Sequence, residues 1–186
     1  MIADSAAGNA PKQSTITEIV TAGGGGGGGG LTWIATATAS NVASVNFDND
    51  LSATYDSYLI IVEGMQPITT GNYLYCLVGT GSGPTYQTSG YLANGTSSTT
   101  SLLQLTPGIG STASRTSSAV YYITNVNSAN DKNIYGDYDV IDNSGSENVS
   151  STGGRWEGAT VLTSIKFKMS ASNVSVGTFK LYGYQN

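Results

Sequence analysis

The sequence has no histidine, and it has a single cysteine, Cys76, among its 186 residues. Without histidine the chain cannot build a Ser-His-Asp triad or a histidine metal site. One cysteine cannot form a disulfide within the chain, and its place in the apolar stretch YLYCLV is typical of a small buried side chain. Because most familiar hydrolytic machinery is excluded, we predict that the chain is not an enzyme and holds no cofactor.

Charge is also scarce. Asp, Glu, Lys and Arg make up 10% of the chain, against roughly 25% in ordinary soluble domains. A neutral surface rich in hydroxyl groups gives little repulsion between molecules, which favours a protein that works within an assembly. The seven basic residues are scattered along the sequence, so we predict no cationic face of the kind that nucleic acid requires.

Long hydrophobic runs are missing as well. No segment approaches the roughly 18 apolar residues of a membrane-spanning helix. The first residues, MIADSAAGNAPKQS, lack the basic start and apolar stretch of a signal peptide. We therefore expect no membrane partner and no secretion by the general route.

What the sequence does have is alternation of apolar and polar residues, rich in β-branched and aromatic side chains. The expected strands cover residues 31–39, 42–47, 57–64, 72–79, 101–105, 117–124, 133–141, 159–169 and 177–184. Turn formers separate them, as in the stretch DNSGSENVSSTGG at 142–154. This pattern predicts an all-β fold over 31–186, an antiparallel β-sandwich or jelly roll, with a closed barrel as the alternative.

Residues 1–30 are predicted to form an extended N-terminal arm that ends in a run of eight glycines, Gly23 to Gly30. Holding a glycine backbone in one shape costs at least about 1–2 kcal/mol per residue, so an ordered run needs substantial outside contacts. We expect neighbouring subunits to capture the arm, with the glycines in a crevice too narrow for side chains. A short helix and an extended arm both fit STITEIV. The predicted arm contacts are Ile16, Ile19, Val20, Gly23, Gly26 and Gly30.

Two groups of carboxylates are candidates for chemistry. Asp137 and Asp139 lie two residues apart in an expected strand and so share one face, which we interpret as the solvated face rather than a glycosidase pair. The stretch FDNDLSATYD offers Asp48, Asp50 and Asp56 as oxygen ligands for Ca²⁺, but their spacing matches no specific calcium loop. Ordinary turn hydrogen bonding is the favoured interpretation, and no metal site is predicted.

Twelve tyrosines form the other candidate set. Tyrosine suits both subunit contacts and sugar stacking, because its ring offers a large contact area and its hydroxyl can stay wet. Tyr86 and Tyr91, in the Gly-rich stretch GPTYQTSGY, are predicted to be surface-binding residues on a loop. Trp33 and Tyr75 are expected to fill the core instead.

Three stretches carry a resemblance to a known family: SVNFDNDLSATYDSYLIIVEGMQP, YLYCLVGTGSGPTYQTSGY and TSIKFKMSASNVSVGTFKLYGY. They are similar to small virion proteins of tailed bacteriophages, over residues 31–186. The matching residues are Phe47, Tyr55, Asp56, Tyr58, Pro67, Gly177, Phe179, Leu181, Tyr182 and Gly183. The resemblance implies a β-sandwich on the virion surface, in a head-decoration or tail-fibre protein that forms a homotrimer.

Two functions follow from these features. In the first, the chain is a capsid decoration or cement protein whose arm, residues 1–30, inserts between neighbouring subunits, with the major capsid protein as partner. In the second, it is a tail-associated module that binds a receptor or a host-surface glycan. The sequence contains no shaft-like repeat of the kind that a fibre needs, which favours the first.

Overall fold

The computed structural model describes residues 30–93, 100–112 and 114–184, and these form β-strands and no helix. The twelve strands are β1 Leu31–Val42, β2 Val45–Phe47, β3 Ser57–Pro67, β4 Leu74–Thr80, β5 Thr85–Tyr86, β6 Tyr91–Ala93, β7 Leu103–Gln104, β8 Ser117–Thr124, β9 Lys132–Ile141, β10 Glu147–Trp156, β11 Ser164–Met169 and β12 Val174–Tyr184. The prediction of an all-β fold is confirmed. Most of the predicted arm contacts lie outside the described residues, namely Ile16, Ile19, Val20, Gly23 and Gly26. Gly30 is exposed and directly precedes β1.

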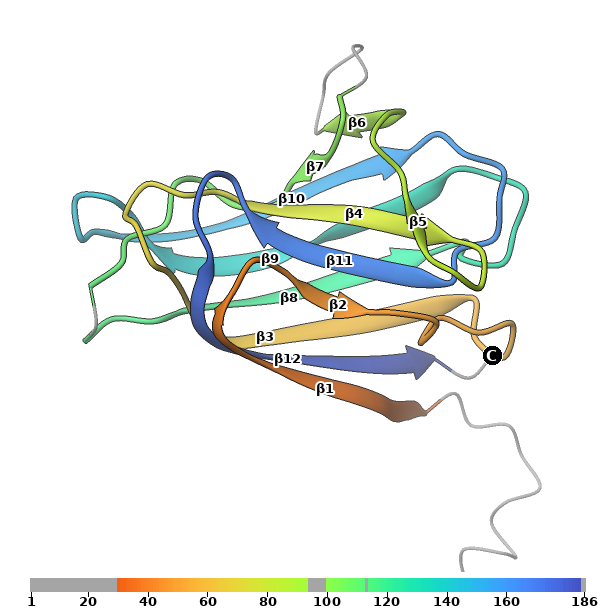
Figure 1. Ribbon diagram of the computed structural model, residues 1–186, viewed down its shortest axis with the longest axis horizontal. Helices are drawn as coiled ribbons and strands as arrows, with labels where there is room; N and C mark the ends of the chain where they lie inside the picture. The colour runs from red at the N-terminus through yellow and green to blue at the C-terminus, as the bar shows by residue number, and fades with distance from the viewer. Residues whose placement is uncertain (1–29, 94–99, 113, 185–186) are drawn as a thin grey trace, which may run out of the picture.

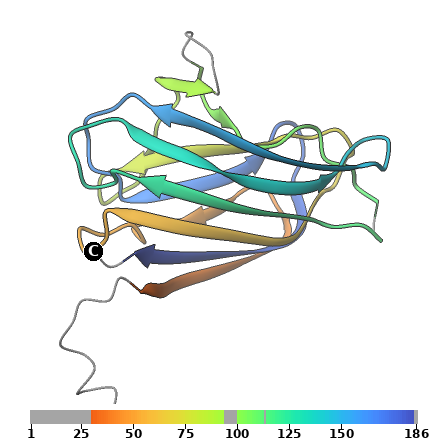
Figure 2. The same cartoon turned by 180° about the vertical axis from the view of Figure 1, so that it is seen from behind.

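The strands form two antiparallel sheets rather than one closed barrel. The larger sheet has seven strands in the order β1-β12-β3-β8-β9-β10-β6, and the smaller has the order β2-β11-β4-β5 with β7 also paired to β4. Figure 1 shows β2, β11 and β4 lying in front of the larger sheet, and Figure 2 shows the larger sheet from behind. The β-sandwich prediction is therefore confirmed.

The connectivity is that of a jelly roll with an added hairpin. Strands β1-β12-β3-β8 and β2-β11-β4-β7 make two facing groups of four, and the chain crosses repeatedly between them. The hairpin β9–β10 comes between β8 and β11 in sequence and extends the larger sheet. This extension gives the larger sheet a broad outer face that the smaller sheet does not cover.

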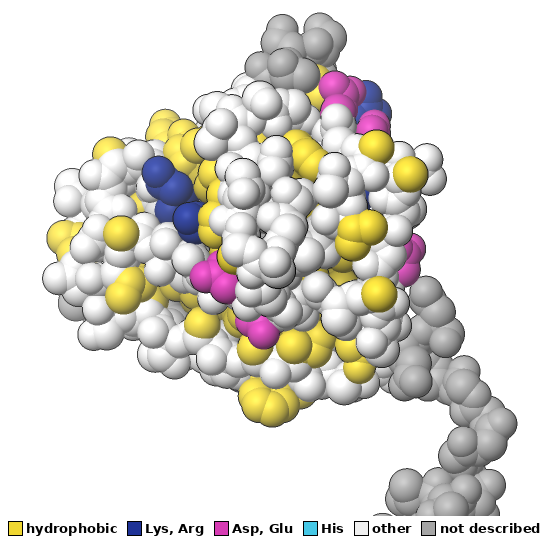
Figure 3. All heavy atoms as spheres, turned by 45° about the vertical axis from the view of Figure 1, so that its right-hand side comes forward, with side chains coloured by type: hydrophobic (Ala, Val, Ile, Leu, Met, Phe, Trp, Pro, Cys, Tyr) yellow, Lys and Arg dark blue, Asp and Glu magenta, His cyan; other side chains and the backbone are white. Residues whose placement is uncertain are grey.

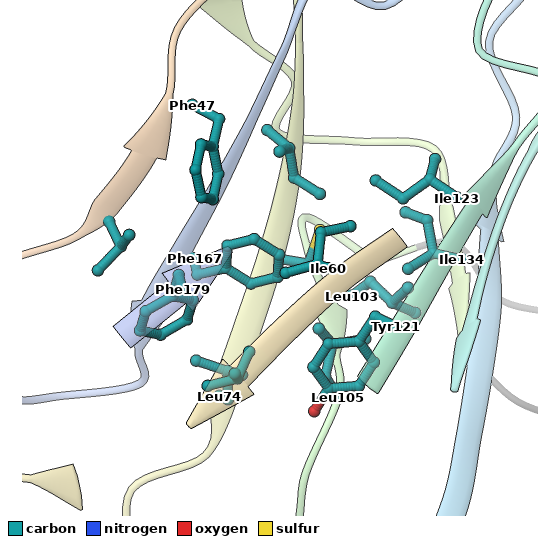
Figure 4. Packing of buried hydrophobic residues seen from close by; sticks show 14 of the residues in the cluster. Phe47, Ile60, Leu74, Leu103, Leu105, Tyr121, Ile123, Ile134, Phe167 and Phe179 are labelled. Atoms are coloured by element: carbon teal, nitrogen blue, oxygen red, sulfur yellow. The ribbon is translucent and has the colours of Figure 1, made fainter. Parts of the chain in front are cut away.

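Aromatic and aliphatic side chains from both sheets fill the space between them, as Figure 4 shows. The ring of Phe167 on β11 lies 5.5 Å from that of Phe179 on β12 and 6.4 Å from that of Tyr121 on β8, between ring centroids. Cys76 is fully buried, as predicted. The alternation in β8 is clean, since Tyr121 and Ile123 are buried whereas the residue between them faces outward.

Two residues expected in the core lie elsewhere. Trp33 is 61% exposed, because the pairing of β1 with β12 shifts register between Trp33 and Ala35. This β-bulge turns Trp33 to the outer face and Ala35 toward the core. Tyr75 on β4 is only half-buried. Its ring stacks on that of Tyr73, the residue just before β4, with the ring centroids 6.3 Å apart.

The stretch 142–154, expected to be a connection, contains most of β10. This strand pairs with β9 along its whole length, from Glu147 opposite Ile141 to Trp156 opposite Lys132. It also pairs with β6, and the two strands lie so close that a Cβ atom on Gly154 would collide with the Leu92 carbonyl oxygen. The expectation of a loop here was wrong, because strand pairing overrides the weak β-propensity of Ser and Gly.

Candidate functional site

A row of large side chains crosses the outer face of the seven-stranded sheet. In the strand register, Trp33 on β1 lies opposite Tyr182 on β12, which lies opposite Leu59 on β3. Leu59 in turn lies opposite Tyr122 on β8, and Tyr122 lies opposite Tyr135 on β9. We call these five residues, Trp33, Tyr182, Leu59, Tyr122 and Tyr135, the aromatic row. Five neighbouring strands thus place one apolar band across the sheet.

Three tyrosine rings of this face, those of Tyr122, Tyr135 and Tyr184, form a stack. The Tyr122 ring centroid lies 5.4 Å from that of Tyr135 and 6.4 Å from that of Tyr184, with interplanar angles of 20° and 28°. Rings stacked in this way cover each other's faces and present their edges to solvent. Desolvation, followed by the nearby Tyr122 and Tyr135 hydroxyls, raises the pKa of Tyr184. Its hydroxyl lies within hydrogen-bonding reach of the Tyr122 hydroxyl.

The same face exposes several large apolar side chains. Trp33 is 61% exposed, Leu31 on the same edge strand 49%, Tyr135 46% and Val149 on β10 68%. By contrast, Leu59 is 5% exposed, because the side chains beside it cover it. Large apolar side chains that gather on one face, rather than being scattered singly, are typical of a contact surface.

A shallow hollow of about 290 Å³ lies beside the aromatic row on this face. Ile61, Val120 and Val149 line it, from β3, β8 and β10. Asp137 and Asp139 lie at its edge, both exposed. Within the described residues neither carboxylate has an ion-pair partner. Their shared solvent-facing position agrees with the sequence prediction.

Charge is sparse on other parts of the surface too. On the side that Figure 3 shows, uncharged side chains predominate and the charged ones gather in small groups. On the outer face of the seven-stranded sheet, Lys180 Nζ forms an ion pair with Glu63 Oε2 at 2.7 Å. This pair is neutral as a whole, so it adds little net charge to the face.

The two predicted surface tyrosines do not form a common site. Tyr91 is fully buried: its hydroxyl accepts a hydrogen bond from the Val78 N–H at 2.8 Å and donates one to the Gln87 carbonyl at 3.2 Å. The prediction that Tyr91 is a surface-binding residue is therefore wrong. Because Tyr91 belongs to β6, which pairs with β10, its ring is drawn into the core rather than left on a loop.

Tyr86, in contrast, is half-buried on β5 at the far side of the sandwich. Its hydroxyl donates a hydrogen bond to Asp48, and Lys166 Nζ lies 3.7 Å from its ring centroid. Burial, followed by the hydrogen bond to Asp48, raises the pKa of Tyr86. Both its hydroxyl and one ring face are thus engaged within the chain.

Two of the three carboxylates of FDNDLSATYD form hydrogen bonds that hold local structure. Asp48 accepts the Tyr86 hydroxyl, and Asp56 Oδ1 accepts the backbone N–H of Asn127 at 3.1 Å. Asn49 between Asp48 and Asp50 adopts a φ of 63°, a left-handed turn conformation that asparagine tolerates. Across the described residues, no three His, Cys, Asp or Glu side chains are close enough to share a metal ion.

A second hollow, of about 360 Å³, opens beside β7 and β10. Its lining includes Gln104, Thr106, Tyr138 and Thr152, with no charged side chain. It offers hydroxyl and amide groups without a group poised for acid–base or nucleophilic chemistry. The outer face of the seven-stranded sheet is therefore the stronger candidate for a functional surface.

Comparison with protein-family models, with curated proteins and with solved structures finds no match to this chain. Among the described residues, no helix is long and apolar enough to cross a membrane. The fold and the site together define a jelly-roll protein whose larger sheet presents an apolar, tyrosine-rich outer face.

Proposed function

We propose that this chain is a structural protein of a tailed-phage virion, a capsid decoration protein on the particle surface. The observation that supports the proposal is the aromatic row, an apolar band whose two ends, Trp33 and Tyr135, are 61% and 46% exposed, in a chain with only 10% charged residues. Interface cores are depleted in charge and enriched in tyrosine and tryptophan, which describes this face. The resemblance of the three stretches to virion proteins supplies the biological setting, and a homotrimer is the proposed assembly.

The stacking of the tyrosines favours a protein partner over a sugar. A pyranose ring binds against the open face of an aromatic ring, whereas the faces of Tyr122 are taken by Tyr135 and Tyr184. Ring edges and hydroxyls suit the mixed apolar and hydrogen-bonding contacts of a protein interface. The major capsid protein and neighbouring copies of this chain are the proposed partners.

Glycan binding at a tail remains the second candidate function, and one observation favours it. Trp33 ends the aromatic row at the sheet edge and is 61% exposed. Its Nε1 donates a hydrogen bond to Thr36 Oγ1 at 3.1 Å, which holds the indole in place. A fixed, exposed indole at an edge can stack on a sugar of a host-surface glycan.

In this proposal the arm, residues 1–30, attaches the subunit to its neighbours. The arm joins the sandwich at the edge of the same sheet, where Leu31 lies opposite Tyr184. Arm and aromatic row would therefore contact neighbouring subunits from one side of the molecule.

The test is attachment of the purified chain to particles that lack it, measured by co-sedimentation, with the oligomeric state measured by light scattering. We expect Trp33→Ser with Tyr135→Ser to abolish trimer formation and attachment without lowering the melting temperature, since both side chains are largely exposed. Tyr73→Ser is the matched control, because Tyr73 is 39% exposed but lies beside the smaller sheet. Unchanged attachment of the double variant would refute the role of this face.

Deletion of residues 1–30 tests the arm separately. We expect the remaining sandwich to fold and to lose attachment. If Trp33→Ala instead abolishes binding to host cells or isolated glycans, and attachment to particles is unaffected, the tail function replaces the decoration function.

A further inference from the structure

We infer that, in the free subunit, the apolar residues of the arm, Ile16, Ile19 and Val20, dock in the hollow on the outer face of their own seven-stranded sheet. This inference rests on the proposed function, because it states how the contact face is covered before the subunit joins a particle. The occupant is the arm of the same chain, and attachment then exchanges this internal contact for contacts with neighbours.

The hollow offers an aliphatic surface that nothing else in the described chain covers. Ile61, Val120 and Val149 line it, and Val149 is 68% exposed. Such a surface promotes association between copies when it is left open. The low charge of this chain provides little repulsion to prevent it. Branched aliphatic side chains from the arm match Ile61, Val120 and Val149 in chemistry. The lining of the hollow also includes Glu63, Asp137 and Asp139.

The hollow lies within reach of the place where the arm joins the sheet. The register runs from Leu31 on β1 through β12 and β3 to β8, which carries Val120. This path crosses three strand spacings and runs four residues along the strands. With spacings of about 4.8 Å across and about 3.3 Å along, Leu31 and Val120 are roughly 20 Å apart.

The glycine run has the length that this distance requires. The segment from Val20 to Leu31 consists mostly of glycine. A flexible glycine-rich segment of about eleven residues has a root-mean-square end-to-end distance of roughly 17–20 Å. Effective concentration is greatest when this length matches the distance to be spanned, and it reaches about the millimolar range. Docking within one chain therefore prevails over docking between chains at ordinary protein concentrations.

Glycine also suits the path that the tether takes. From Leu31 to the hollow it must pass the aromatic row, where Tyr122 and Tyr135 stand close together. A tether without side chains can lie against these rings without steric conflict. This gives a physical reason for eight consecutive glycines at this place in the sequence.

Disulfide trapping in the full-length chain tests the inference. The variant Ile19→Cys with Val149→Cys places one thiol in the arm and one beside the hollow, and Cys76 does not interfere because it is buried. We expect a crosslink within one chain, at a rate that does not depend on protein concentration. The matched control is Ile19→Cys with Tyr73→Cys, whose second thiol lies beside the smaller sheet. It should react at least about tenfold more slowly.

A further variant separates docking from tethering alone. Adding Ile16→Ser and Val20→Ser to the Ile19→Cys, Val149→Cys chain keeps the tether but removes the apolar contacts, so the crosslink should form at least about tenfold more slowly. Equal rates with and without these changes, equal rates for the Tyr73 control, or crosslinks only between chains that vanish on dilution would each overturn the inference.

The attachment assay keeps the two proposals distinguishable. Attachment to particles by a chain that shows no internal crosslink refutes the docking and leaves the decoration function standing. An internal crosslink that depends on Ile16 and Val20, together with no attachment to particles by the same chain in its reduced, uncrosslinked form, refutes the decoration function and leaves the docking standing.

Discussion

Gly136 in β9 is the position where the structure tolerates a side chain least. It lies opposite Tyr121 of β8 in the middle of the seven-stranded sheet. A Cβ atom here would overlap the carbonyl oxygen of Val120 and lie 2.8 Å from the Tyr121 Cα. Since ordinary van der Waals contact for a Cβ begins at 3.4 Å, Gly136→Ala would force the two strand backbones apart. The buried side chains of Tyr121 and Ile134 would have to move with them.

The loss of stability in Gly136→Ala depends on the atoms that the new Cβ would meet. Forcing extra atoms into a packed interior costs about 1–3 kcal/mol. The obstacle is backbone and cannot rotate aside, so we expect the upper end, about 3 kcal/mol. One kcal/mol shifts the melting temperature of a domain of this size by about 2–4 °C. Gly136→Ala should therefore lower it by roughly 6–12 °C in thermal unfolding followed by circular dichroism.

Gly83, between β4 and β5, supplies the control. Nothing lies within 4 Å of a Cβ built there, and its φ is not in the left-handed region. Gly83→Ala should leave the melting temperature within about 2 °C or raise it slightly, because alanine reduces the freedom of the unfolded chain. If Gly136→Ala melted as close to the unmodified protein as this control does, the argument from strand proximity would be refuted.

Three further predictions concern buried or capping polar groups. The Tyr121 hydroxyl is buried and has no hydrogen-bond partner among the described residues, so Tyr121→Phe should leave stability to urea unchanged or raise it by about 1 kcal/mol; a clear loss would contradict this. The Lys132 side chain is fully buried, and its Nζ donates to three backbone carbonyls. Lys132→Met removes the hydrogen-bond donor of these carbonyls and should lower the free energy of unfolding in urea by about 2–4 kcal/mol. An unchanged urea midpoint would show that the carbonyls find other partners. Hydrogen bonds from the Ser144 side chain and then from the Ser146 backbone lower the pKa of Asp142. A carboxyl whose pKa is lower in the folded state stabilises the fold above its unfolded pKa, and this is lost as the pH falls through the folded value. Asp142→Asn should therefore reduce the free energy of unfolding at pH 7, and the reduction should be smaller near pH 2. A reduction that does not change with pH would contradict the lowered pKa of Asp142.

Strand β8 shows how far alternation alone can lead. In SSAVYYIT the buried and outward residues alternate without interruption, and the strand was predicted with its observed bounds, Ser117–Thr124. Strand β10 shows the limit of the same method. Its sequence, ENVSSTGGRW, has no apolar alternation and is rich in residues of low β-propensity. It becomes a strand because β9 and β6 pair with it, and pairing between distant segments leaves no local signal.

The aromatic row could not be predicted from the sequence for a related reason. Alternation indicates that Tyr122 faces away from Tyr121, so single outward tyrosines could be assigned. The aromatic row, however, depends on the order β1-β12-β3-β8-β9, which brings Trp33 beside Tyr182 from the other end of the chain. The prediction for Tyr91 was wrong because the glycines near it suggested an exposed loop. The structure instead has a three-residue strand there, β6, which pairs with β10.

The bulge in β1 connects the fold to the proposed function. Without it, regular alternation would place Trp33 on the same side as Ala35, and the indole would add to the core. The register shift instead sends Ala35 inward and leaves Trp33 61% exposed. Leaving Trp33 exposed gives up stability, because burial of a large aromatic side chain is among the most favourable contributions to folding. Where a fold departs from the rule that serves its stability, a functional contact is the expected reason. The exposed end of the aromatic row therefore supports the proposal that this face meets another protein.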